Sequence, residues 1–356
     1  MSLPNHGANP HHVYKSLGLT APARIIDFSE NVNPLGPPES IQSAWKDFQK
    51  SMRLYPDPLG EPFRTNVANY HNISPNSVFI GNGAAEIFSL LAERFRGKRA
   101  ILVHPTFSEY EATLKVRHVD IVNVFIKEIS TGELPVDVLK NHMCHADVLY
   151  LCTPNNPTGT LPKRRVIEDL IAHAWISNCE LVLDEAFIDF ISEESSFISS
   201  LLAPHVIVVR SMTKMYAMPG LRLGYMVAAP STVRELQQLA PHWNVNGIAA
   251  EVGSLVLKEE AYRQKTIQHS VNMRLDISEF LTGYGCEVTQ SQANFLLFRL
   301  QQPHADFFQN FLRRGIVLRH TMNFHGLNGQ WYRIGMKTED EMRILKKELN
   351  TWFAEH

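Results

Sequence analysis

Residues 211–224 read SMTKMYAMPGLRLG, and this stretch decides how the rest of the sequence is interpreted. Lys214 follows closely on an apolar run, VIVV, and has two small hydroxyl residues beside it, Ser211 and Thr213. Arg222, eight positions further on, offers a planar fork that matches a phosphate. Burial and a neighbouring cation lower the pKa of a lysine towards neutrality, which a covalent bond to a carbonyl group requires. The pattern predicts a lysine bonded to a phosphorylated cofactor rather than a solvated one.

Short apolar, β-branched runs alternate with segments of helical periodicity over the first two thirds of the chain. Strands that alternate with helices imply a mostly parallel sheet covered on both faces. We therefore expect an α/β fold with a seven-stranded sheet. The expected strands are 78–80, 100–103, 121–126, 148–151, 181–183, 206–209 and 223–228, and the expected helices include 84–95, 107–116 and 164–175.

Polar residues close several of these strands, and ligands bind beyond the carboxyl ends of parallel strands. GNGAAE at 81–86 is a turn that opens a helix, where the free amides of Ala84 and Ala85 favour a phosphate. By itself such a turn is more often simple geometry.

Asp184 ends the strand LVLD and has two readings. It could be the magnesium-binding acid of an ATPase, but that requires a G-x-x-x-x-G-K-[ST] loop, which the sequence lacks. A buried acid can instead pair with a cationic nitrogen, such as the pyridinium of pyridoxal phosphate. We favour the second reading.

Composition excludes several other classes of protein. The 356 residues are 44% apolar and 20% charged, as in soluble globular proteins, and the formal net charge of -2 gives no attraction for nucleic acid or acidic membranes. No apolar run is long enough to cross a bilayer, and no secretion signal is recognised. Without C-x-x-C pairs or zinc-site spacing, we expect no metal and reduced thiols in a cytoplasmic protein. The cysteines are Cys144, Cys152, Cys179 and Cys286.

Past residue 230 the regular alternation of short apolar runs with helical segments ends, which suggests a second unit. A long helical stretch at 260–282 is followed by short strand-like segments and a terminal helix. We expect three parts: an N-terminal arm at 1–38 that packs on the small domain, a large cofactor-binding domain at 39–250, and a small C-terminal α+β domain at 251–356.

Taken in order, GNGAAE, PTFSEYE, NNPTG, DEAF and SMTKMYAMPGLRLG resemble the fold-type I pyridoxal-phosphate enzymes, the aspartate aminotransferase superfamily, over nearly the whole chain. The resemblance implies pyridoxal 5'-phosphate as cofactor, with Lys214 bonded to it and Asp184 paired with its pyridine nitrogen. The remaining cofactor contacts that it implies are Asn156 at the phenolate oxygen, Phe107 on the ring, and Ala84, Ala85, Ser211 and Arg222 at the phosphate.

Two further positions are informative. Tyr55, in RLYPDP, matches a tyrosine that reaches the phosphate of the partner subunit, so the resemblance implies a homodimer with shared active sites. Phe187 is a departure, because many relatives have there a tyrosine that donates a second hydrogen bond to the phenolate. With phenylalanine the pKa of the lysine–cofactor linkage should be higher, and plain transamination is less expected.

Two subfamilies share these motifs. Histidinol-phosphate aminotransferases share NPTG, DEA and SxTK, but NHGAN at 5–9, the phenylalanine of DEAF and NFHGL at 323–327 are more similar to threonine-phosphate decarboxylases of cobalamin synthesis. The resemblance thus implies decarboxylation of O-phospho-L-threonine, with aminotransferase activity as the alternative. It places the substrate, which carries a phosphate and a carboxylate, on His6, Gly7, Asn31, Asn156, Arg319 and Arg333.

A non-enzymatic role is a further alternative, because the same fold serves as a ligand-sensing module in some transcription regulators. The sequence has no helix-turn-helix extension and no basic patch, which argues against it. The choice between decarboxylation and transamination depends on which bond of the substrate stands perpendicular to the cofactor ring, and the sequence does not display that.

Overall fold

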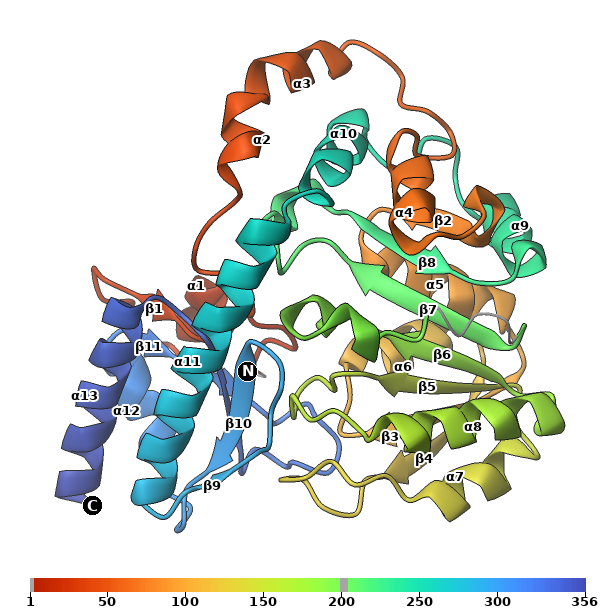
Figure 1. Ribbon diagram of the computed structural model, residues 1–356. Helices are drawn as coiled ribbons and strands as arrows, with labels where there is room; N and C mark the ends of the chain where they lie inside the picture. The colour runs from red at the N-terminus through yellow and green to blue at the C-terminus, as the bar shows by residue number, and fades with distance from the viewer. Residues whose placement is uncertain (1–2, 199–203) are drawn as a thin grey trace.

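The computed structural model describes residues 3–198 and 204–356. Residues 1–2 of the expected arm and 199–203 of the expected large domain lie outside the described residues. The chain forms an α/β fold in which a seven-stranded sheet, seen on the right of Figure 1, stands beside a smaller unit on the left.

The large sheet has the strand order β2-β8-β7-β6-β5-β3-β4. β8 runs antiparallel to both of its neighbours, and all other neighbouring pairs are parallel. The expected mostly parallel, seven-stranded sheet is therefore confirmed. Its strands are β2 (Val78–Gly81), β3 (Arg99–His104), β4 (Asp120–Phe125), β5 (Val148–Cys152), β6 (Glu180–Asp184), β7 (Val206–Ser211) and β8 (Gly224–Val227).

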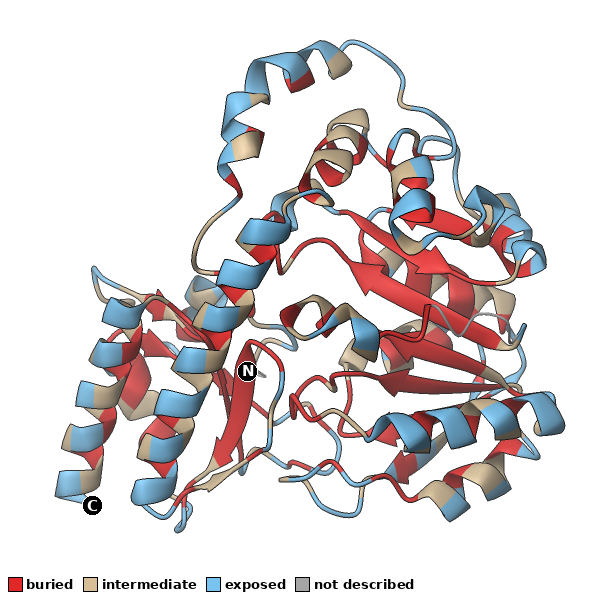
Figure 2. Cartoon of the chain, in the orientation of Figure 1, coloured by how far each residue is buried: buried red, intermediate tan, exposed pale blue. Residues whose placement is uncertain are grey.

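Helices cover both faces of this sheet (Figure 1). Successive strand residues point to opposite faces, so Leu149 packs in one core and Tyr150 in the other. Strands buried on both sides read as continuous apolar runs, which is why the sequence revealed them. Figure 2 shows the inner strands as buried, whereas the edge strand β4 has a single buried residue, Val124. One face carries α5 (Ala84–Arg94), α6 (Ser108–Val116) and α9 (Pro230–Leu239), and the other α4 (Phe63–His71), α7 (Val136–Met143), α8 (Arg164–Ser177) and α10 (Gly247–Val256).

The smaller unit is built around an antiparallel sheet in the order β12-β13-β10-β9. Its last helix begins with a capping box, in which Thr338 and Glu341 each accept a hydrogen bond from the other's backbone amide. The elements are α11 (Glu260–Gly283), β9 (Glu287–Val288), β10 (Phe295–Arg299), α12 (Phe307–Arg313), β11 (Ile316–Val317), β12 (Arg319–His320), β13 (Tyr332–Gly335) and α13 (Glu339–Glu355).

The N-terminal segment first packs on the smaller unit and then crosses to the large sheet. β1 (Ile26–Asp27) pairs in parallel with β11, and the Tyr14 hydroxyl of α1 (Pro10–Ser16) donates a 2.7 Å hydrogen bond to the Leu312 carbonyl. α2 (Glu39–Ser43) and α3 (Trp45–Ser51) instead contribute to the large-sheet core. The domain limits at residues 38 and 250 stay a proposal; α10 runs through the second.

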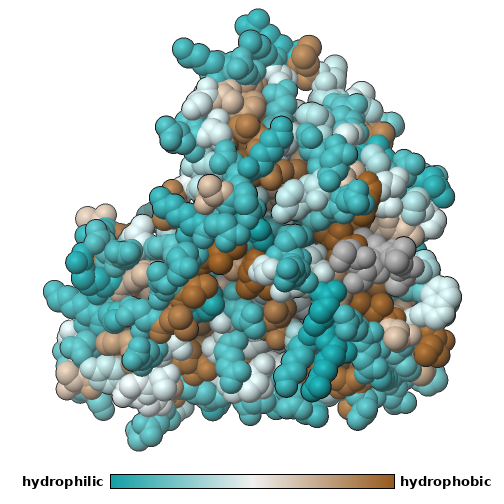
Figure 3. Space-filling view, in the orientation of Figure 1, coloured by the Kyte–Doolittle hydropathy of each residue, from teal (hydrophilic) through white to brown (hydrophobic). Residues whose placement is uncertain are grey.

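The face seen in Figure 3 is largely hydrophilic, with apolar side chains in small groups. Among residues 3–198 and 204–356, no helix has the length and apolar content that a bilayer span requires. All four cysteines are free thiols, and only Cys144 is exposed.

Candidate active site

A cavity opens where the carboxyl ends of β5, β6 and β7 face the arm and the smaller unit. Every residue that the sequence predicted for the cofactor and substrate lines this cavity, except Tyr55. Segments far apart in sequence meet here, because parallel strands all end at one edge and the arm returns over that edge.

Lys214 lies in the turn after β7 and is half-buried. Its Nζ donates a 2.9 Å hydrogen bond to Ser211 Oγ, which lies 3.0 Å from the Thr213 hydroxyl. Burial, with a smaller contribution from the Arg222 charge, lowers the pKa of Lys214 to about 8, although Asp184 opposes the shift. A lysine in this state supplies a neutral amine near physiological pH, as attack on a carbonyl carbon requires.

Asp184 is the last residue of β6 and is only 4% exposed. Each of its oxygens has a donor: Oδ1 accepts a 2.9 Å hydrogen bond from the Ala186 amide, and Oδ2 accepts one from the Tyr110 hydroxyl. Burial raises the pKa of Asp184, while these two hydrogen bonds and the charge of Lys214 lower it. A buried carboxylate aimed into a cavity is suited to pair with a cationic ring nitrogen.

A cradle for a phosphate lies at the start of α5. Gly83 has φ 77°, and a Cβ built there would lie 2.5 Å from Nη2 of Arg222. Arg222 itself has a left-handed φ of 56°, and its Nη1 donates a 3.0 Å hydrogen bond to the Pro219 carbonyl. The guanidinium is thereby held against the helix start, where the amides of Ala84 and Ala85 favour an anion. The donor set fits the phosphate of pyridoxal phosphate.

Two aromatic rings border the cavity. Phe107 precedes α6, and its ring lies 6.1 Å from that of His6. Phe187 is buried against Phe295, with ring centroids 4.9 Å apart, and its ring centroid lies 5.7 Å from Lys214 Nζ.

Two buried arginines face the cavity from the smaller unit. Arg333 donates to the Ser29 carbonyl at 2.8 Å and to Asn156, and its Nε has no partner in the described part of the chain. Arg319 donates to the Asn5 carbonyl at 2.5 Å. Burial lowers the pKa of Arg319 to about 10 and that of Arg333 to about 9. Anions bound beside them would oppose this cost of burial.

The arm contributes three of the predicted residues. His6 Nε2 lies 2.8 Å from a carboxylate oxygen of Glu109 on α6, which ties the arm to the large sheet. Gly7 passes so close to Ser29 that a Cβ there would lie 2.3 Å from the Ser29 carbonyl oxygen. Asn31 lines the cavity, and in the amide orientation that suits its neighbours its side-chain oxygen lies 3.2 Å from Nη1 of Arg333.

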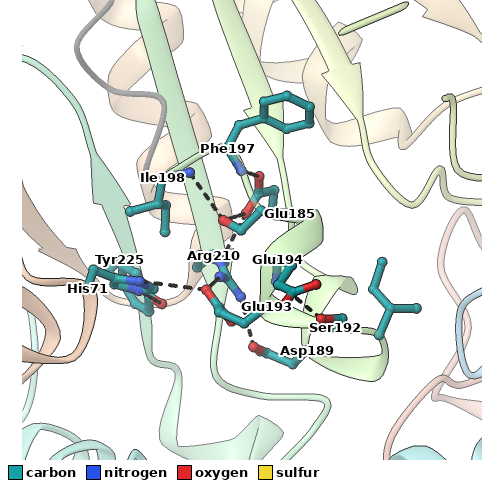
Figure 4. Close-up of polar contacts among 12 residues, drawn as sticks. His71, Glu185, Asp189, Ser192, Glu193, Glu194, Phe197, Ile198, Arg210 and Tyr225 are labelled. Atoms are coloured by element: carbon teal, nitrogen blue, oxygen red, sulfur yellow. Dashed lines mark hydrogen bonds and ion pairs between the residues drawn. The ribbon is translucent and has the colours of Figure 1, made fainter. Parts of the chain in front are cut away.

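A buried ion network anchors the strand ends beneath the site (Figure 4). Arg210 precedes Ser211, and Glu185 follows Asp184, so the network joins the two strands that carry the central residues. Arg210 Nε lies 3.1 Å from Glu185 and its Nη1 donates a 2.8 Å hydrogen bond to Asp189, while Nη2 donates to Glu193. Because a buried guanidinium left unpaired is strongly destabilising, the three carboxylates fix this geometry.

One predicted site residue lies elsewhere, and one residue that the sequence reading did not assign lies at the centre. Tyr55 is 82% exposed, with its ring 4.9 Å from that of Trp243. Tyr110 belongs to the PTFSEYE motif, but the sequence alone does not indicate that its hydroxyl binds Asp184. Among residues 3–198 and 204–356, no group of three or more histidine, cysteine or acidic residues is arranged to hold a metal ion.

The chain is similar to known proteins over most of its length. The family model for aminotransferase class I and II matches residues 23–349. The chain is 34% identical to threonine-phosphate decarboxylase of Salmonella typhimurium, over 94% of this chain and 92% of that protein. It is 32% identical to a histidinol-phosphate aminotransferase of Nitratidesulfovibrio vulgaris, over 90% and 87%. The crystal structure of L-threonine-O-3-phosphate decarboxylase from Porphyromonas gingivalis superposes with a TM-score of 0.80, at 25% identity, covering 92% of this chain and 99% of that one.

Proposed function

The chain belongs to the aminotransferase class I and II family, whose cofactor is pyridoxal 5'-phosphate, and within it we propose a lyase that decarboxylates O-phospho-L-threonine. The products are (R)-1-amino-2-propanol O-phosphate and carbon dioxide, in cobalamin biosynthesis. The likeness to threonine-phosphate decarboxylases over nearly the full chain supports this choice.

One observation carries the proposal. Two buried guanidiniums, those of Arg319 and Arg333, line one cavity, and in the described part of the chain neither forms an ion pair with a carboxylate. Arginine forks suit both carboxylate and phosphate, so the pair fits a substrate that carries one of each. His6, Gly7 and Asn31 complete the proposed substrate site from the arm.

Each residue has a defined task in this proposal. When bound, the cofactor accepts the electrons of the broken bond into its conjugated ring. Asp184 holds positive charge on the ring nitrogen, and the arginines hold the substrate carboxylate and phosphate in fixed directions. Lys214, with its pKa near 8, returns a proton to the α-carbon after carbon dioxide leaves.

We further propose a homodimer in which Tyr55 reaches the phosphate site of the partner. Its exposed ring lies outside the cavity of its own chain, against the exposed ring of Trp243 and near in sequence to the exposed Met52 and Leu54. Exposed apolar groups of this kind are typical of protein–protein contacts.

Histidinol-phosphate aminotransferase is the second candidate, supported by relatives of that activity at 32% identity. Two arginines are also compatible with it, because 2-oxoglutarate carries two carboxylates. An assay distinguishes the two reactions, because one releases carbon dioxide and the other depends on 2-oxoglutarate.

The test is to incubate holoenzyme with O-phospho-L-threonine and measure carbon dioxide. Stoichiometric release together with 1-amino-2-propanol O-phosphate supports the proposal. No release, combined with 2-oxoglutarate-dependent turnover of histidinol phosphate, overturns it in favour of the aminotransferase.

A further inference from the structure

Tyr110 is a buried residue whose hydroxyl serves a single carboxylate. It lies on α6, is 1% exposed, and donates its hydroxyl hydrogen to Oδ2 of Asp184. Its ring is fixed by aromatic neighbours: the Phe88 centroid lies 4.8 Å away and the Phe107 centroid 5.6 Å away, both edge-on. The hydroxyl therefore has one position available, against Asp184.

The direction of this hydrogen bond is also fixed. Burial, followed by the charge of Asp184, raises the pKa of Tyr110 well above its usual value, so the phenol keeps its proton and remains a donor. Asp184 is only 4% exposed, and burial raises its pKa. Donors to the charged form oppose that rise: the Tyr110 hydroxyl and the Ala186 amide both donate to Asp184, and the Cys152 thiol makes a smaller contribution.

We propose that Tyr110 is a positioning residue that holds Asp184 ionised and directed into the cavity, where it would pair with the ring nitrogen of the bound cofactor. This inference rests on pyridoxal phosphate as cofactor and not on which substrate is decarboxylated or transaminated. It also gives a role to the second aromatic residue of PTFSEYE, three positions after Phe107.

The experiment compares Tyr110→Phe with Tyr150→Phe as a matched control. Tyr150 on β5 is also buried, its ring centroid lies 5.4 Å from that of Tyr110, and its hydroxyl has no hydrogen-bond partner in the described part of the chain. The readouts are the Kd of pyridoxal phosphate for the apoprotein, from quenching of intrinsic fluorescence, and the pH midpoint of the bound cofactor's visible absorbance.

Tyr110→Phe should weaken cofactor binding on the order of 10-fold, as expected for loss of a hydrogen bond to a charged group. It should also raise the absorbance midpoint, because a ring with less positive charge makes protonation of the Lys214 linkage easier. Tyr150→Phe should stay within about 2-fold of wild type. Equal effects of the two substitutions, or a wild-type Kd and midpoint for Tyr110→Phe, would overturn the proposal.

Testing Tyr110→Phe in a second background, Asp184→Asn, distinguishes a positioning role of Tyr110 from a general packing role. In Asp184→Asn protein, the amide no longer needs a donor to stabilise a charge, so adding Tyr110→Phe should change the Kd little. A further 10-fold loss in that background would mean that the tyrosine acts independently of Asp184, which contradicts the proposal. Because no substrate is used, these results are independent of the decarboxylation assay.

Discussion

Nη1 of Arg333 donates a 2.5 Å hydrogen bond to Oδ1 of Asn156, which joins the smaller sheet to the end of the large one. A guanidinium only donates, so the amide oxygen of Asn156 faces Arg333 and its Nδ2 is left as a donor. The proposed substrate arginine thereby fixes the side chain that would donate to the cofactor's phenolate oxygen.

Arg333→Lys should consequently affect substrate and cofactor together. Lysine keeps the charge but loses the planar fork, so one nitrogen would have to replace the two that bind Asn156 and Ser29 and also hold the substrate. We expect kcat/KM to fall about 10- to 100-fold in steady-state assays. Arg299→Lys, on the neighbouring strand and paired with half-buried Glu287, is the control and should be near wild type. Wild-type kinetics for Arg333→Lys would contradict the assignment.

The depressed pKa of Lys214 predicts how cofactor uptake depends on pH. Only the neutral amine attacks the aldehyde, so the rate constant for uptake by the apoprotein should rise as pH increases and level off above about 8. An ordinary lysine would level off near 10.4. Stopped-flow absorbance between pH 6 and 10 measures this directly, and a rate that keeps climbing through pH 10 would show that the site does not depress the pKa.

Phe187→Tyr tests the departure from the usual pattern. Phe187 is buried beside the cavity and has no hydrogen to donate. A tyrosine hydroxyl donating to the phenolate would reduce the attraction of that oxygen for the proton on the Lys214 linkage. We expect the absorbance midpoint to move to lower pH in a spectrophotometric titration, and an unchanged or raised midpoint would contradict the expectation.

Because of His71, we expect the free energy of unfolding to fall in mild acid. Burial, then the charge of Arg210, lowers the pKa of His71 to about 3, and this outweighs the Glu193 oxygen 3.6 Å from Nδ1. Tyr225 and Tyr70 are its other polar neighbours.

The unfolded chain binds a proton at His71 below pH 6.5 and the folded chain does not, so stability falls as pH falls from 6.5 towards 3. Between pH 6.5 and 5, wild type should lose about 2 kcal/mol more than His71→Gln in urea unfolding. Parallel losses in the two proteins would show that His71 protonates in the folded state.

The sequence predicted the seven strands and the strand-end residues Asp184 and Lys214 because these depend on local patterns, whereas His6, Arg319 and Arg333 came only from the family resemblance. Apolar runs flanked by turns mark buried strands, and parallel strands must bring Asp184 and Lys214 to one edge. The Tyr110–Asp184 bond joins residues 74 positions apart and depends on the tilt of α6, which no periodicity encodes. The ion pairs of Arg210 with Glu185, Asp189 and Glu193 could not be predicted from the sequence either, because they too depend on how separate elements pack.

The central claim is that Lys214 carries the cofactor, and the most direct measurement is the site of attachment. The pyridoxal-phosphate-loaded protein is reduced with borohydride, digested, and mapped by mass spectrometry, with Lys214→Ala as the control. The account predicts a phosphopyridoxyl group on Lys214 and none in the control. A label on another lysine, with Lys214 unmodified, would contradict it.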